Sequence, residues 1–433
     1  MTTLIIFMFV FLVIIIVGIL NEKIFHIPND IALVLFSTVV GISLLLLSRV
    51  ESLSILNTVT ETYSSFDFAE FLFHGVHCFM LFAGASKLHF SKLMSNAKSV
   101  ILLSTITTVI FAAGFGVLFW LVSNLLGIAL DIWVCILLGC ILGPTAPLAV
   151  TGILDKLGVA KSVTSVMEGE SLFNEGIAVA LFVFVRGIVD NSHTENFAVA
   201  ISKEILGAVA VSLALSFLTF FLVRHTRDPI KQIIISLLNV SSSYIICESF
   251  GFSGAIASVV CGVYYAYYME KIKRTRVITD PHELYVGFWH IIDDVINNVL
   301  FVLIGFSILT ISFSVRSVWL CVLAVVIALV ARAVGVLVSS LFIRKKNIPL
   351  NYTPLEYTSL MTWCGLRGGL SLALVMNVKT IFADTPMVYT HLINTTYVVI
   401  LFTVIVQGFT SGVVFKLTEK HKTKRLHVGG KSR

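Results

Sequence analysis

Long apolar runs follow one another through this sequence almost without interruption, and they constrain the fold more than any other feature. A helix needs about 20 apolar residues to span the hydrocarbon core of a bilayer. Runs this long and unbroken exclude a transmembrane β-barrel, whose strands are short and alternate in polarity. We therefore predict an all-α, polytopic membrane protein with about 13 transmembrane helices, in segments 3–20, 27–48, 67–86, 99–123, 130–154, 162–189, 197–222, 229–248, 251–268, 285–310, 317–343, 355–378 and 386–415.

Composition leaves no room for a large soluble domain. Of the 433 residues, 57% are hydrophobic and 12% are charged, which is about half the charged share of an average soluble domain. The seven cysteines are scattered through the apolar runs without a CxxC pair, so we expect small buried side chains rather than a disulfide or metal framework. We expect one transmembrane transporter domain at 1–415 and a short basic tail at 416–433, with no nucleic-acid partner.

The positions of lysine and arginine predict the orientation, because cytoplasmic loops carry an excess of them. Of the 30 basic residues, 23 fall in one alternating set of loops and in the tail, five fall in the opposite loops, and two lie inside segments. One missed or invented helix would destroy this division. The first segment lacks the basic start and the cleavage site of a signal peptide. We expect the N-terminus outside and the C-terminus in the cytoplasm.

Ionisable groups inside the apolar segments are the first candidates for function, since a charge at the bilayer centre costs roughly 2.5–3.5 kcal/mol on insertion scales. The densest group lies in segment 162–189, in the run MEGESLFNEGIAVALF. Helical spacing places Ser171 and Glu175 on one face, with Glu168 a turn before them, while Glu170 and Asn174 form the adjacent row. Three carboxylates so close together require cations, protons or an arginine nearby.

Two apolar segments contain glycine and proline where a regular helix cannot continue. The first break is GPTAP at 143–147, and the second is GLRGG at 365–369. If segment 197–222 is a linker, the breaks occupy matching positions in an inverted repeat of six-helix units, with the two broken helices crossing. Paired interruptions of this kind are typical of secondary transporters with a site near the midplane, although a single break is equally typical of a kink or a close helix contact.

These motifs resemble those of the monovalent cation:proton antiporter superfamily, in its sodium/proton exchanger (NhaP/NHE-like) branch. GCILGPTAPLAV from Gly139 resembles the broken-helix segment of that family, and GESLFNEG from Gly169 resembles its ion-binding helix. TWCGLRGGLSLAL from Thr362 resembles the arginine-bearing segment, and VQGFT from Val406 resembles the signature of the final helix. The motifs follow the family order over nearly the whole chain.

The resemblance implies roles for individual side chains. It gives Glu175 the position of the carboxylate that binds the cation or the proton, preceded by Asn174. It makes Ser171 and Thr145 accessory cation ligands, so that Na⁺ or another monovalent cation is bound at Glu175, Ser171 and Thr145. It also implies an ion pair between Glu170 and Arg367, and a buried arginine does need a carboxylate partner.

The resemblance implies a secondary antiporter that exchanges a monovalent cation for H⁺, with Na⁺ preferred over Li⁺ or K⁺ as the expected ion. A single exchanging carboxylate predicts electroneutral 1:1 exchange, without a cofactor and with a role in pH homeostasis. Two departures leave an alternative open, because Ala146 and Ala83 stand where the family usually has acidic residues. The alternative is a cation channel or a transport-silent sensor on an antiporter scaffold. An enzyme is disfavoured, because the sequence has no HExxH or GxSxG motif.

Other ionisable groups are candidates for the ion pathway. Glu70, His74 and His77 lie near the outer half of their segment, where the two histidines at i,i+3 either ligate a metal or sense pH, or line an aqueous funnel. Asp293 and Asp294 lie near the inner end of theirs, where they either attract cations or form a solvated helix end.

Three further expectations concern Arg332, the oligomeric state and the type of membrane. Arg332, inside segment 317–343, is expected to pair with one of these acids (Glu70, Asp293 or Asp294) or with helix carbonyls. The resemblance suggests a homodimer surrounded by membrane lipid. The short hydrophilic tail favours a prokaryotic inner membrane.

Overall fold

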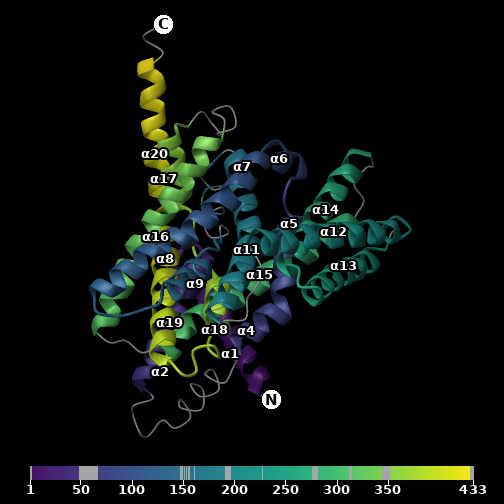
Figure 1. Ribbon diagram of the computed structural model, residues 1–433. Helices are drawn as coiled ribbons and strands as arrows, with labels where there is room; N and C mark the ends of the chain where they lie inside the picture. The colour runs from purple at the N-terminus through teal and green to yellow at the C-terminus, as the bar shows by residue number, and fades with distance from the viewer. Residues whose placement is uncertain are drawn as a thin grey trace.

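The computed structural model describes residues 2–47, 67–146, 150, 152, 154, 157–159, 161–190, 197–226, 228–275, 281–311, 315–343 and 352–429. Every regular element within these ranges is a helix, as Figure 1 shows. The prediction of an all-α fold is therefore confirmed.

The helices are, in chain order, α1 (Thr2–Leu20), α2 (Asn29–Leu47), α4 (Phe68–Glu70), α5 (His77–Ser86), α6 (Phe90–Ser95), α7 (Ala97–Leu102), α8 (Thr108–Leu125), α9 (Ile132–Ile141), α11 (Lys161–Val189), α12 (Phe197–Arg224), α13 (Pro229–Ser249), α14 (Gly254–Thr275), α15 (Pro281–Phe306), α16 (Val315–Phe342), α17 (Pro354–Trp363), α18 (Gly369–Asn377), α19 (Pro386–Leu401) and α20 (Gly408–Gly429). Wider π-helical turns join three pairs of them, α4 to α5, α7 to α8 and α19 to α20.

Nine helical stretches within the described ranges are long and apolar enough to cross a bilayer. Two shorter apolar helices, α5 and α9, lie in the predicted segments 67–86 and 130–154. Each predicted segment contains one helix or two helices joined by a turn or a break, and residues 147–149, 151 and 153 of segment 130–154 lie outside the described residues. The number of membrane crossings and the inverted repeat stay predictions.

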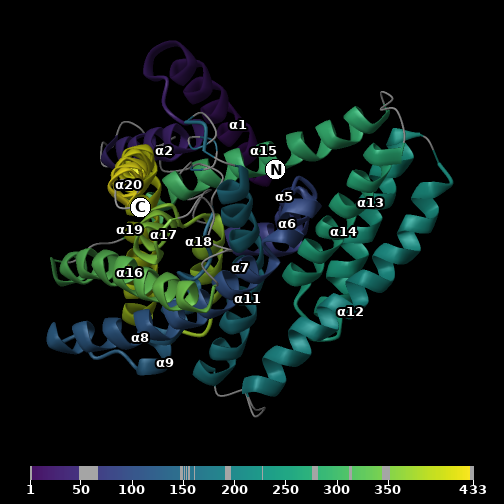
Figure 2. The same cartoon turned by 90° about the horizontal axis from the view of Figure 1, so that it is seen from above.

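The helices form two groups, which Figure 2 shows from above. In the first group, α14 packs against α5, α12 and α13, and α15 packs against α5. Helix α15 also contacts α2, which Figure 2 shows beside α20. In the second group, α8 packs against α9 and α16, and α16 also packs against α17 and α19. Helix α11 contacts α9 on one side and α14 on the other, so it lies where the two groups meet.

Glycines allow the closest helix contacts in both groups. A Cβ atom at Gly139 of α9 would lie 2.2 Å from the carbonyl oxygen of Ala112 in α8, and one at Gly262 of α14 would lie 2.6 Å from the carbonyl oxygen of Phe82 in α5. Small residues at such contacts let helix backbones approach closely in a membrane, where van der Waals packing drives association. These glycines therefore set the spacing of α8 with α9 and of α5 with α14.

The two glycine-rich and proline-rich motifs interrupt helices. Helix α9 ends at Ile141, and 143–146 are not helical, since Pro144 lacks the N–H that a helix would need there. Helix α17 ends at Trp363, and the chain is unwound before α18 begins at Gly369. Pro147, the second proline of the first break, lies outside the described residues. The two unwound stretches meet, because the backbone N–H of Ala146 donates to the carbonyl of Leu366 at 2.8 Å.

Candidate functional site

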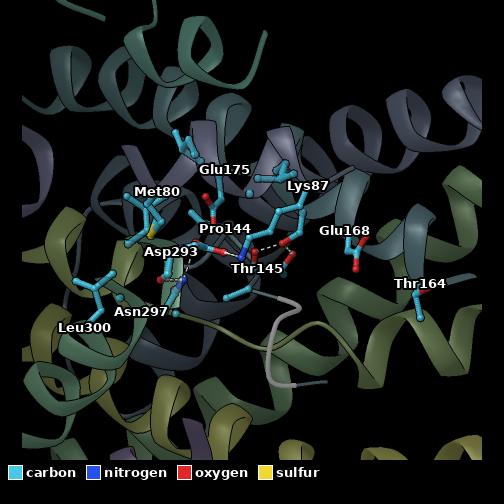
Figure 3. Close-up of a pocket in the computed structure, with 18 of the residues that line it drawn as sticks. Met80, Lys87, Pro144, Thr145, Thr164, Glu168, Glu175, Asp293, Asn297 and Leu300 are labelled. Atoms are coloured by element: carbon cyan, nitrogen blue, oxygen red, sulfur yellow. Dashed lines mark hydrogen bonds and ion pairs between the residues drawn. The ribbon is translucent and has the colours of Figure 1, made fainter. Parts of the chain in front are cut away.

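A cavity of about 310 Å³ lies beside this crossing, between α11 and the first group (Figure 3). Its walls come from α5, the first break, α11, α15 and the start of α18. Its polar and charged lining consists of Lys87, His89, Lys92, Thr145, Thr164, Ser165, Glu168, Ser171, Glu175, His290, Asp293 and Asn297. The cavity thus brings together residues from five separate parts of the chain.

Glu175 is a buried carboxylate on the α11 side of the cavity. It lies in the middle of α11 and is only 9% exposed. Its carboxylate makes no hydrogen bond or ion pair with any other residue that the structure describes. Burial disfavours an ionised carboxylate unless a positive charge accompanies it. A buried carboxylate without such a partner is a place where a mobile cation or a proton binds.

Oxygen atoms from the first break and from α11 converge next to Glu175. The hydroxyl of Ser171 donates to the carbonyl of Thr145, and the two hydroxyl oxygens are 3.2 Å apart. Nδ2 of Asn174 donates to Oγ1 of Thr145 at 2.9 Å, while its Oδ1 is buried without a partner among the described residues. Unwound carbonyls and hydroxyls of this kind are suited to a small monovalent cation.

The partner of Glu170 differs from the one expected. The expectation that Glu170 pairs with Arg367 is wrong, because Glu170 binds Arg332 of α16 through two hydrogen bonds of 2.8 and 3.0 Å. Both side chains are only 4% exposed. Arg332 reaches Glu170 past the second break, where a Cβ at Gly365 would lie 3.0 Å from its Nε. Glycine at that position leaves room for the guanidinium, and the bidentate pair neutralises Glu170.

Arg367 instead holds the two breaks together. Its Nη1 donates to the carbonyls of Gly143 and Pro144 at 2.6 and 3.2 Å, and its guanidinium lies 4.2 Å from the ring centre of Phe111. Its backbone N–H donates to Oγ1 of Thr403 at 3.0 Å. Carbonyls of an unwound segment have no partner within a helix, so a donor must come from elsewhere. Arg367 supplies that donor from the opposite break.

The first group contributes a second buried carboxylate to the cavity. Asp293 of α15 is 1% exposed, and its Oδ2 accepts from Nζ of Lys87 at 2.6 Å. Its Oδ1 accepts from Nδ2 of Asn297 at 2.9 Å. The neighbouring Asp294 has a side chain that is 74% exposed and lies 3.9 Å from Nζ of Lys87.

The other residues singled out in the sequence are spread more widely. Glu168 lines the cavity, one turn before Ser171. Glu70 and His77 do not line it, and His77 is buried with both ring nitrogens unpartnered among the described residues. The side chain of His74 lies outside the described residues. Within the described part of the chain, no group of three or more His, Cys, Asp or Glu residues could hold a metal ion.

Lys87 was expected only among the basic residues of the loops, and its place in the cavity was not predicted. A usable signal was present, because a buried aspartate near the inner end of one segment needs a positive charge, and Lys87 follows another segment on the same side. His290, which also lines the cavity, was not singled out either.

Comparison with known proteins agrees with this architecture. The sequence model of the family described as "Sodium/hydrogen exchanger, transmembrane" matches residues 8–417. The Na⁺/H⁺ antiporter NhaP of Pseudomonas aeruginosa is 29% identical over 360 residues, which cover 81% of this chain and 82% of that protein. The low-affinity Na⁺/H⁺ antiporter NhaS1 of Synechocystis is 29% identical over 347 residues, covering 78% of this chain and 62% of that longer protein.

The fold is similar to that of a solved antiporter. The sodium proton antiporter MjNhaP1 of Methanocaldococcus jannaschii aligns with a TM-score of 0.74 and 19% identity, over 96% of this chain and 98% of that one. The helix order, the two breaks and the family match over nearly the entire length point the same way. This chain is a multi-pass integral membrane protein that belongs to the transmembrane sodium/hydrogen exchanger family of transporters.

Proposed function

We propose that this protein is a secondary antiporter that exchanges a monovalent cation for H⁺, with Glu175 binding one or the other. The observation that carries the proposal is the buried carboxylate of Glu175, which lines the cavity and has no fixed positive partner among the described residues. The names of the antiporters that the chain resembles support the same activity.

The charges around Glu175 support a 1:1 exchange. Glu170 is neutralised by Arg332, and Asp293 is neutralised by Lys87. Glu175 then carries one cation or one proton at each crossing. The empty, ionised form crosses poorly, because its charge is uncompensated in a medium of low dielectric constant. Coupled, electroneutral exchange follows from that penalty.

The ligands proposed for the cation are all oxygen atoms. Glu175 supplies its carboxylate, and Thr145 and Ser171 supply carbonyl or hydroxyl oxygens. Asn174 offers the unpartnered Oδ1. Na⁺ is the expected substrate, with Li⁺ and K⁺ as alternatives that an ion series distinguishes. Ala146 lines the same cavity and offers only a methyl group, which favours a channel or a transport-silent sensor as the second candidate.

We further propose a homodimer in contact with membrane lipid, with the N-terminus outside and the C-terminus in the cytoplasm of a prokaryotic cell. Exposed apolar side chains along α1, α12 and α16 are suited to lipid or to a second copy, among them Leu12, Phe217 and Val326.

The test is proton movement in sealed vesicles that contain the purified protein and an internal pH dye. We expect Na⁺, and Li⁺ or K⁺ to a lesser extent, to drive alkalinisation of the lumen at a rate that is unchanged when the membrane potential is clamped. Glu175→Gln removes the exchanging carboxylate and should lower the rate by about 100-fold or more. Glu22→Gln makes the same chemical change at an exposed position and should have no effect.

Two results would contradict this scheme. Exchange that persists in Glu175→Gln would show that another group carries the proton. Current without proton movement, or no response to any cation by folded protein, would favour the channel or the silent scaffold.

A further inference from the structure

The cavity contains a positive charge of its own. Lys87 follows α5, and its side chain enters the cavity, where Nζ lies 2.6 Å from Oδ2 of Asp293 (Figure 3). The Lys87 side chain is 20% exposed, and that of Asp293 is 2% exposed. The pair is therefore largely shielded from water, unlike an exposed ion pair whose charges are screened.

Both partners belong to the same wall. Helices α5 and α15 pack against each other in the first group, while Glu175, Ser171 and Thr145 belong to the facing wall. Asn297, one turn after Asp293 on α15, holds the other oxygen of its carboxylate. The ammonium group is thus fixed opposite the site at which the transported cation is proposed to bind.

Charged groups of both signs line the cavity. The charges of Asp293 and Glu175 interact across it. The other ionisable groups that line it are His89, Lys92, Glu168 and His290. Asp294, next to Asp293, lies 3.9 Å from the same ammonium. Because Asp293 and Glu175 are both buried, one unit of charge gained or lost here acts strongly on a bound cation.

We propose that Lys87 is a tethered cation that neutralises Asp293 and thereby sets the affinity of the Glu175 site for the transported cation. The inference rests on the proposed function, because it assumes that Glu175 binds that cation. With the pair intact, Asp293 and Lys87 together contribute no net charge. Without Lys87, Asp293 becomes a second attracting carboxylate. Without Asp293, the ammonium keeps only the more distant Asp294, 3.9 Å away, among the carboxylates described beside it. It then competes with the transported cation for Glu175.

The test measures the cation concentration at half-maximal exchange in vesicles at alkaline pH, separately from the maximal rate. Lys87→Gln retains a hydrogen-bond donor but loses the charge, and it should lower that concentration roughly tenfold. Asp293→Asn should raise it by a similar factor. The double variant Lys87→Gln/Asp293→Asn restores the net charge and should return it to within about threefold of the original value.

Two control variants separate charge from structure. Lys87→Arg keeps the charge and should stay close to the unaltered protein. Lys98→Gln removes one positive charge at an exposed position beyond the cavity and should leave the half-saturating concentration unchanged. A purely structural role for the pair would lower the amount of folded protein or the maximal rate, without shifts of opposite sign in the two single variants.

The outcomes are distinguishable. If unaltered protein exchanges cations but Lys87→Gln and Asp293→Asn shift the half-saturating concentration in the same direction or not at all, the tethered-cation inference is overturned alone. If unaltered protein shows no exchange, the proposed function fails. Stabilisation of the protein by Na⁺ against heating then tests cation affinity in the same variants, and equal stabilisation in all of them overturns the inference as well.

Discussion

The buried ion pair of Glu170 with Arg332 links α11 to α16 beside the second break, and its energy can be measured. Arg332→Met removes two charge-assisted hydrogen bonds of 2.8 and 3.0 Å. Glu170 would keep only the amide donor of Asn174, 3.1 Å away, as a described side-chain partner. Breaking a buried pair in this way leaves an uncompensated charge and typically costs about 3–5 kcal/mol. We expect Arg332→Met to destabilise the protein by that amount.

A double-mutant cycle identifies the partner. Glu170→Gln alone also leaves a buried charge, this time on Arg332. The double variant Glu170→Gln/Arg332→Met leaves no charge unpaired, so its cost should fall below the sum of the single costs by about 2 kcal/mol or more. The same cycle with Arg367→Met should give a coupling smaller by at least about 1 kcal/mol, because Arg367 donates to backbone carbonyls of the first break.

The assay is equilibrium unfolding in mixed detergent micelles, followed by tryptophan fluorescence, for the unaltered protein and the five variants. Circular dichroism before unfolding shows whether each variant begins from the same helical content. A stronger coupling of Glu170 to Arg367 than to Arg332 would refute the pairing. A cost of less than about 1 kcal/mol for Arg332→Met would refute the claim that the pair is desolvated.

Two further substitutions test the site and the helix packing. Thr145→Val keeps the shape of the side chain but loses the hydroxyl oxygen, so the half-saturating cation concentration should rise about tenfold, with a smaller change in maximal rate. The same change at the exposed Thr105 should leave both values unaltered. An unchanged half-saturating concentration in Thr145→Val would show that Thr145 is not a cation ligand. Gly139→Ala places a Cβ 2.2 Å from the carbonyl oxygen of Ala112 and should lower the free energy of unfolding by about 1–3 kcal/mol. Gly18→Ala is the control, because its Cβ meets no atom within 4 Å. Equal effects of the two substitutions would contradict the close contact at Gly139.

Part of the candidate site could be predicted from spacing alone. Ser171 and Glu175 lie four residues apart in an apolar run, and helix geometry places such residues on one face whatever the surrounding fold is. Both line the cavity, as does Glu168 a turn earlier. The chemistry of Pro144 likewise prevents a regular helix at the first break without any knowledge of its neighbours.

Partnerships between distant side chains could not be predicted in the same way. Two arginines lie within apolar segments, and elementary electrostatics requires a counter-charge or carbonyl acceptors for each of them. The sequence does not show which of the two arginines forms the ion pair with Glu170. Arg332 lies 162 positions beyond Glu170, and Asp293 lies 206 positions beyond Lys87. Those pairings depend on where the packing of the helices places α16 relative to α11 and α5 relative to α15.

The sequence by itself determined the all-α class, the places where helices cannot continue and the face of α11 that carries Ser171 and Glu175. These features follow from hydrophobicity, backbone chemistry and helical period, which act over one or two turns of the chain. The tertiary structure decided that Glu170 binds Arg332, that Arg367 holds the carbonyls of the first break, and that Lys87 enters the cavity to bind Asp293. Buried charges must find partners within a few ångströms, and only the packing of helices sets which charges come that close.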